Sequence, residues 1–328
     1  MAIASADPAI DMLLDSDEPL IRWRALVDLL EVDDRDPRVR EARAAIPSGQ
    51  IVRTLVQERR GDHPYRKWAG VHWRLVSLMD LGVPADLPGV RELMPAEFAW
   101  LTGHGQEPRR RKVPVLEARP RVCGSQDGNA LAVAVHFGYA DDPRSRVLVE
   151  ALVDWQWPDG GWNCDRHPEA SHSSVNESFA PLRGLAAFAR ASGDRRVAMA
   201  ADRAAERAAE FFLRHRVVFS ERTGEPMRPV VVELHYPPYW HYDLLVGLRV
   251  LAESSHLADP RTADALDLLE SRRRPDGGWA PDKAFYRRPG SSTGLVEVVD
   301  WSAARRGAAS EPLTLFAMLV LKAAGRLA

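Results

Sequence analysis

Two cysteines and a later histidine are the residues best suited to chemistry in this sequence. Cys123 and Cys164 are the only cysteines among the 328 residues, and His172 follows the second. Thiolate and imidazole are preferred zinc ligands, and catalytic zinc uses three protein ligands with one position open. We therefore expect Cys123, Cys164 and His172 to hold zinc. The alternative is that both cysteines are small buried hydrophobic side chains, since no C-x-x-C spacing is present.

Acidic side chains and a histidine form a second candidate group. Glu177, His241, Asp243 and Glu311 lie at or near the starts of apolar segments. If those segments are helices packed side by side, the four side chains meet at one rim of a cavity. Carboxylates in an apolar cavity acquire separated pKa values, which suits general acid–base catalysis. The alternative for each residue is helix N-capping.

Aromatic and amide side chains near the same starts are candidates for substrate contact. We assign this role to Trp73, Asn129, Trp240 and Tyr242. Aromatic faces attract cations, and an apolar pocket with few polar groups is a common ligand site. The alternative is that the aromatic rings only pack at the turns between repeats.

A recurring string marks the elements that would position these residues. An aspartate near a proline precedes a helical pattern at Pro37, Pro88, Pro143 and Pro260, and a proline-free copy begins at Gly193. Aspartate caps the free amides of a helix start, and proline fits the first turn. Each copy therefore predicts a helix, and the recurrence predicts an array of repeated units.

A second set of segments lies between these amphipathic helices. It is richer in Leu, Ala and Val, with members near Glu18, Lys67, Asp127, Asn176, Trp240 and Glu311. Apolar helices alternating with amphipathic ones indicate an inner and an outer ring. We predict an all-α fold, an α/α toroid with about six inner and five to six outer helices. A short extended stretch is expected only near Val218.

The predicted toroid is one domain covering 1–328. Residues 1–17 form an N-terminal segment, and 101–121 and 217–239 are inserted loops. The first of these loops is rich in Pro, Arg and Gly, which interrupts the helical pattern.

The turns carry a family resemblance. Trp155-Gln156-Trp157-Pro158-Asp159-Gly160-Gly161-Trp162 resembles the Q-x-x-D-G-G-W repeat of squalene-hopene cyclases, oxidosqualene cyclases and prenyltransferase β subunits. Arg273 to Trp279 repeats its D-G-G-W half. The chain also resembles short bacterial squalene-cyclase-like proteins. The resemblance implies a single terpene cyclase/prenyltransferase-like toroid and a hydrophobic or isoprenoid-like small molecule as partner.

The chain departs from these families in its catalytic motifs. The D-x-D-D acid of squalene cyclases, the DDxxD motif and the D-x-C zinc pair of protein prenyltransferases do not occur. No catalytic set can therefore be transferred whole from those families.

The composition narrows the classes of function and partner that are possible for this chain. The chain has 44 basic and 46 acidic residues. Hydrophobic residues make up 45% of the sequence and charged residues 27%. The nearly equal numbers of basic and acidic residues do not indicate the positively charged surface that binds nucleic acid. We expect no nucleotide cofactor. The sequence has no apolar stretch of transmembrane length and no secretory pattern at its start, so we expect a cytoplasmic protein.

Two functions remain open at this point. An enzyme would use a deep central pocket with converging polar groups, with zinc or acid–base help at the rim. A non-catalytic toroid that binds a ligand or partner would have its cavity filled by large side chains.

Overall fold

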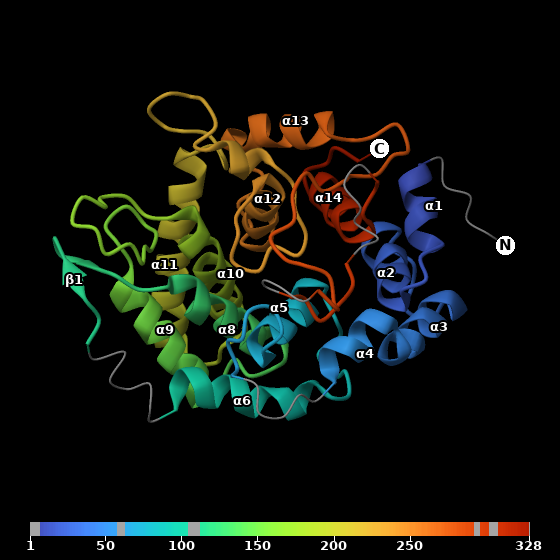
Figure 1. Ribbon diagram of the computed structural model, residues 1–328, viewed down its shortest axis with the longest axis horizontal. Coiled ribbons are helices and arrows are strands. Elements are labelled where there is room, and N and C mark those ends of the chain that lie inside the picture. The colour runs from blue at the N-terminus through green and yellow to red at the C-terminus, as the bar shows by residue number, and fades with distance from the viewer. Residues whose placement is uncertain (1–6, 58–62, 104–111, 292–295, 302–307, 328) are drawn as a thin grey trace.

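The computed structural model describes residues 7–57, 63–103, 112–291, 296–301 and 308–327. This part of the chain is mostly helical, which confirms the predicted helical class. One group of helices contributes many of the buried residues: α2 (Pro19–Arg24), α5 (Val71–Asp80), α8 (Gly124–His136), α10 (Val175–Ala191), α12 (Leu244–Glu253) and α14 (Glu311–Ala323). Most of these helices lie toward the centre of the molecule in Figure 1, and α2 lies nearer its edge.

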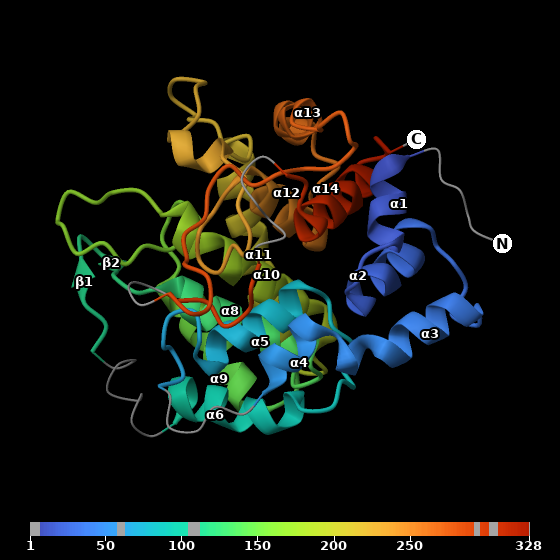
Figure 2. The same cartoon turned by 45° about the vertical axis from the view of Figure 1, so that its right-hand side comes forward.

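The remaining helices lie at the periphery of this arrangement in Figure 1, and Figure 2 shows the same molecule turned. They are α1 (Pro8–Leu14), α3 (Pro37–Ala45), α4 (Gln50–Val56), α6 (Val90–Thr102), α9 (Pro143–Trp155), α11 (Arg195–Arg214) and α13 (Ala263–Ser271). A π-helical turn η1 (Ala25–Leu29) continues α2. Short 3₁₀ turns are η2 (Ile46–Ser48), η4 (Pro229–Val232) and η5 (Pro260–Thr262). Strands β1 (Val115–Leu116) and β2 (Arg119–Pro120) pair antiparallel.

Neighbouring central helices pack in chain order. α8 packs against α5, α9 and α10, and α12 packs against α10 and α14. α14 in turn packs against α1, α2 and η1, so the last described helix lies against the first. None of the helices in the described part of the chain combines the length and apolarity needed to cross a membrane.

Aspartate capping starts most of the peripheral helices, as predicted. Asp36, Asp142 and Asp259 each accept a hydrogen bond from the amide two residues later, at 2.8–2.9 Å. The string at Pro88 behaves differently. Helix α6 begins at Val90 after Gly89, whose φ of 91° only glycine adopts readily, and Asp86 pairs with Arg43 instead.

One capped helix lies inside the predicted N-terminal segment 1–17. Asp7 accepts a hydrogen bond from the Ala9 amide at 3.0 Å and begins α1. This is a further copy of the aspartate–proline string. Residues 1–6 lie outside the described residues, as do 104–111 of the predicted loop 101–121. The loop 217–239 contains η4 and an isolated bridge between Phe219 and Pro226, near the extended stretch expected at Val218.

The two tryptophan turns are built alike. Trp162 is fully buried, donates from its indole to Leu152 O at 3.0 Å and donates from its backbone amide to the Ser178 hydroxyl oxygen at 3.0 Å. Trp279 repeats this with Leu269 O at 2.8 Å and Thr314. Each ring therefore fastens the end of a peripheral helix to the start of the next central helix.

Candidate functional site

A short backbone pairing sets the two cysteines side by side. The Val122 amide donates to Asn163 O at 3.1 Å, and Arg121 forms a parallel bridge with Asn163. The next residue on each segment is a cysteine. Segments 41 positions apart in sequence therefore present Cys123 and Cys164 to the same space. Cys123 directly precedes α8, and Cys164 lies in the loop that leads to α10.

Cys123, Cys164 and Glu177 form a group able to hold a metal ion. Their sulfur and carboxylate atoms all lie within 4.8 Å of one another, and each residue is half-buried. We call this group the Cys-Cys-Glu cluster. His172, which the sequence suggests as the third ligand, is exposed and lies outside this cluster. The loop after Cys164 instead uses the His172 carbonyl to accept a hydrogen bond from Asn163 at 2.8 Å.

Glu177 lies in the first turn of α10 and is held by the first turn of α8. Its Oε2 accepts hydrogen bonds from the Ser125 amide at 3.0 Å and from the Ser125 hydroxyl at 2.8 Å. Its Oε1 accepts from the Cys164 thiol at 3.2 Å. Two helix N-termini with free amides thus meet at this carboxylate, a setting that favours negative charge.

Close backbone approach makes this contact possible. A Cβ added to Gly124 would lie 2.9 Å from Trp162 Cβ and 3.0 Å from Glu177 O. Deeper along the same pair, a Cβ on Gly128 would lie 2.3 Å from Pro181 N. Glycine at both positions lets α8 and α10 touch, which brings Ser125 within reach of Glu177.

The electrostatics of the cluster favour a bound cation. A hydrogen bond between the Cys164 thiol and Cys123, burial and the Glu177 charge together raise the pKa of Cys164 well above its usual range. Burial raises the pKa of Tyr65 to about 12, and the neighbouring Cys123, Glu177 and Cys164 add to this. Without a cation the Cys164 thiol keeps its proton, because a further anion beside the Glu177 carboxylate is unfavourable in so small a volume. A divalent metal would displace the thiol protons.

The donor set fits zinc. Zinc accepts thiolate sulfur and carboxylate oxygen together, and three protein ligands are the number found in catalytic sites. Ser125 supplies the outer contact that holds a ligating carboxylate in one orientation.

The four predicted acid–base residues do not converge. Asp243 is fully buried, caps α12 by accepting from the Val246 amide at 2.8 Å, and lies 2.7 Å from His235 Nδ1. Glu311 accepts from the Ser16 hydroxyl at 2.6 Å, on the far side of α12 from Glu177. The capping alternative therefore holds for Asp243, and one common acid–base rim is not formed.

His241 lies beside His235, with the two ring centres 5.8 Å apart, and is poorly suited to proton transfer near neutral pH. Its ring stacks on Phe285 at 3.7 Å and on Trp240 at 4.0 Å. Burial, with the adjacent His235, lowers the pKa of His241 to about 3. The ring is therefore neutral at physiological pH and cannot act there as a general acid.

The predicted substrate-contact residues lie mainly in packed regions. Trp73 and Tyr239 pack with Trp68 in a buried aromatic cluster, in which the Trp68 and Tyr239 rings stack at 4.5 Å. Asn129 donates to Tyr239 O at 3.4 Å. Trp240 borders the cluster. Packing of large side chains is the outcome that we associated with a non-catalytic toroid.

Tyr242 is likewise a packing residue and does not face a cavity. It is fully buried, stacks on Phe212 at 5.3 Å and donates its hydroxyl to Val217 O at 2.7 Å.

Behind the aromatic cluster, the Tyr239 hydroxyl donates to Glu297, a buried carboxyl whose other oxygen accepts from the Val298 amide at 3.0 Å.

Comparison with known proteins gives distant structural neighbours. No family profile and no curated protein matches the chain. It is similar to three solved structures of the type II terpene cyclase MstE from Scytonema. Two variants in complex with geranylgeranyl dihydroxybenzoate are 14% and 15% identical, each covering 84% of this chain and 96% of theirs, with TM-scores of 0.27 and 0.26. The apo form is 16% identical over 78% of this chain and 88% of its own, with a TM-score of 0.24. Likeness at these scores supports neither an activity nor a substrate for this chain.

Sequence reasoning missed two residues of the site. Ser125 follows Cys123 by two positions, and its place in the first turn of a helix was visible from the sequence. Tyr65 comes from the segment before α5, and no local pattern connects it with residues 123–177. Only the folded arrangement brings it to the cluster.

Proposed function

We propose that this chain is a zinc-dependent enzyme with the α/α-toroid fold, similar in type to terpene cyclases and prenyltransferases. Its chemistry would take place at Cys123, Cys164 and Glu177, on a hydrophobic, isoprenoid-like small molecule. The observation that carries the proposal is the convergence of two thiols and a carboxylate within 4.8 Å.

The packing order of the helices supports the toroid. The central helices contact one another in the order α5, α8, α10, α12 and α14, and α14 also contacts α2. Peripheral helices cover this series on the outside (Figure 1). An inner ring of six helices with an outer ring is the arrangement that this order favours. The substrate class rests on the resemblance of the Trp162 and Trp279 turns to those of the cyclases and prenyltransferases.

The chain's own residues would perform distinct tasks. Cys123 and Cys164 supply soft sulfur ligands, and Glu177 supplies an oxygen ligand that Ser125 holds at 2.8–3.0 Å. Zinc with three such ligands supplies Lewis-acid chemistry at its open position. Tyr65, protonated up to about pH 12, can donate a hydrogen bond beside the cluster. The amides at the starts of α8 and α10 stabilise negative charge that develops there.

Metal content of protein purified without a metal-binding tag tests the zinc site. We expect about one zinc per chain in the wild type, because protein sites with thiolate ligands bind zinc tightly at neutral pH. The Cys123→Ser, Cys164→Ser double variant should lose the zinc, and Glu177→Gln should bind it more weakly. His172→Ala is the matched control and should keep it. Zinc retained by the double variant would contradict the site, as would a metal-free wild type whose two thiols are joined as a disulfide.

A non-catalytic toroid is the second candidate, favoured by the aromatic cluster of Trp68, Trp73 and Tyr239. Cobalt substitution separates the two. A catalytic site has an open coordination position, so its visible absorption bands should shift when azide or a small thiol is added. A closed structural site should give the same spectrum with and without these ligands. Turnover of a farnesyl-type substrate that requires the metal would then establish the enzyme.

A further inference from the structure

A second site lies at the opposite ends of the same helices. A cavity of about 600 Å³ is lined by Arg24, Asp80, His136, Arg183, Arg249 and Glu253, among other residues. Asp80, His136 and Glu253 are the last residues of α5, α8 and α12. We call this space the arginine cavity. Because α8 runs for thirteen residues between Cys123 and this end, the cavity lies about 20 Å from the Cys-Cys-Glu cluster.

Four arginines face the cavity against two acids. Arg183 and Arg249 are buried, Arg24 is half-buried, and Arg190 lies exposed at the edge. The acids are Asp80 and Glu253. Outside the lining, Asp28 pairs with Arg24 at 2.6 Å. Burial lowers the pKa of His136, which leaves this ring neutral near pH 7. The space therefore has an excess of positive charge even after Asp28 is counted.

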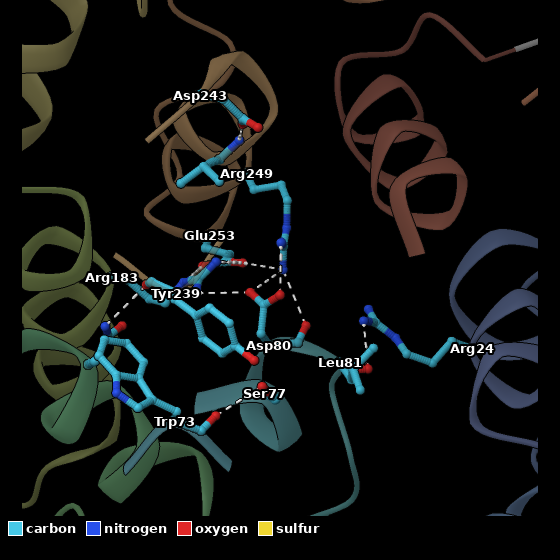
Figure 3. A network of polar contacts seen from close by, with 12 residues as sticks. Arg24, Trp73, Ser77, Asp80, Leu81, Arg183, Tyr239, Asp243, Arg249 and Glu253 are labelled. Carbon is cyan, nitrogen blue, oxygen red and sulfur yellow. Dashed lines mark hydrogen bonds and ion pairs between the residues drawn. The ribbon is translucent and has the colours of Figure 1, made fainter. Parts of the chain in front are cut away.

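The guanidinium groups are held in fixed positions. Asp80 lies between Arg183, at 3.1 Å, and Arg249, at 2.9 Å, as Figure 3 shows. The Arg249 guanidinium also stacks over the Phe316 ring, with its central carbon 3.6 Å from the ring centre. The two arginine contacts to carbonyls, from Arg249 to Asp80 O and from Arg24 to Leu81 O, cap the end of α5. Capping explains these bonds and does not require Arg183.

Arg183 already binds a carboxylate in the way that a ligand could. Its Nε and Nη2 donate to the two oxygens of Glu253 at 2.6 and 3.1 Å, while Nη1 donates to Asp80. Within the described residues this uses three of its five N–H groups. The Glu253 side chain is 40% exposed, so it can turn toward solvent and yield its place.

The remaining walls are apolar, and many of their side chains are small. Ala132, Val135, Ala187, Ala252 and Leu319 leave space between the helices. A buried network of charges usually lowers stability compared with apolar packing of the same volume. Apolar packing would have been the more stable filling of this space, yet the structure keeps a cavity with fixed charges there.

We propose that the arginine cavity binds an amphiphile with a carboxylate head group and an apolar chain. The carboxylate contacts Arg183, Arg249 and Arg190 in competition with Glu253, and the chain lies along the alanine and valine walls. The volume is in the range of ligand pockets. This site is separate from the proposed zinc centre and does not depend on it.

Calorimetric titration of the full chain with dodecanoate tests the proposal. We expect one site per chain, with dodecanol binding about tenfold more weakly, because it lacks the charge that the guanidinium groups recognise. Glu253→Gln removes the competing carboxylate and should tighten dodecanoate binding. Arg190→Gln, at an exposed position, should weaken it. The same titration of the Cys123→Ser, Cys164→Ser variant should be unchanged, so failure of the zinc site and failure of this site are distinguishable.

A space-filling variant locates the binding. Ala252→Phe places a ring in the cavity and should weaken dodecanoate binding at least about tenfold. Ala44→Phe, on the exposed face of α3, is the matched control and should bind normally. Equal affinity for dodecanol, no detectable binding of dodecanoate, or undiminished binding by Ala252→Phe would each overturn the proposal. If Ala252→Phe does not fold, the opposite shifts expected for Glu253→Gln and Arg190→Gln decide the question.

Discussion

The buried carboxyl of Glu297 should make stability fall as pH rises. Its side chain is enclosed behind Tyr239, and burial, only partly offset by hydrogen bonds, raises its pKa from 4.5 to about 7. A raised pKa means that the folded protein binds the proton more tightly than the unfolded chain. The resulting stability is fully present below pH 4.5 and is lost as pH rises through 7.

The size of the effect follows from the shift. A change from 4.5 to 7 is 2.5 units, which at 1.36 kcal/mol per unit corresponds to about 3.4 kcal/mol, of which about 2.5 kcal/mol falls between pH 5 and pH 8. Glu297→Gln keeps the shape and cannot ionise. We therefore expect the wild type to lose about 2.5 kcal/mol of unfolding free energy relative to Glu297→Gln across this range.

Urea unfolding at half-unit steps from pH 5 to pH 8 measures this difference. Burial lowers the pKa of His136, His215 and His241, and their ionisation contributes a trend of the opposite sign. That trend is common to both proteins and cancels in the difference. Glu169→Gln, at an exposed glutamate, sets the baseline. A wild-type minus Glu297→Gln difference that does not change with pH would refute the reasoning.

Three further outcomes follow from the structure. Zinc affinity should rise with pH by up to about tenfold per unit for each thiol proton released, because Cys164 must lose a tightly held proton; competition with a chromophoric chelator at several pH values measures this. Asp80→Ala should destabilise the fold by about 3–5 kcal/mol, since it leaves Arg183 and Arg249 buried without their shared partner; urea unfolding shows it, and a loss below 1 kcal/mol would contradict the role of Asp80. Trp162→Ala should cost about 3–5 kcal/mol through the lost ring and its hydrogen bond to the α9 end, and near wild-type stability would show that the turn is not a fastening point.

Local patterns made the helix starts predictable. A cap such as that of Asp142 depends on residues within one turn, so the sequence contains all the information that is needed. The helix predicted at Pro88 also forms, but it begins at Val90 without an aspartate cap, because Gly89 follows the proline in a left-handed conformation. Proximity of Cys123 and Cys164 could be inferred from the repeat, since both precede a central helix.

The partners of those cysteines could not be inferred in the same way. Repeat alignment gives the height of a residue along the array but not its direction around each helix axis. Glu177 rather than His172 completes the cluster because α8 and α10 touch at glycines. The arginine cavity could not be predicted from the helix starts, because it forms where the end of α5, with Asp80, meets Arg183 in the middle of α10 and Arg249 of α12.

The contact of α14 with α1 and α2 has a consequence for folding during synthesis. Lys322 donates to the carbonyls of Asp28 and Leu29 at 2.8 and 3.0 Å, and Ser16 donates to Glu311. The first helices therefore leave the ribosome almost 300 residues before their partner. α8 and α10 can pack as soon as both have emerged, whereas α2 exposes its apolar face until α14 arrives. We expect the middle of the chain to fold first and its two ends to join last, so a nascent chain stalled before Glu311 should stay bound to chaperones.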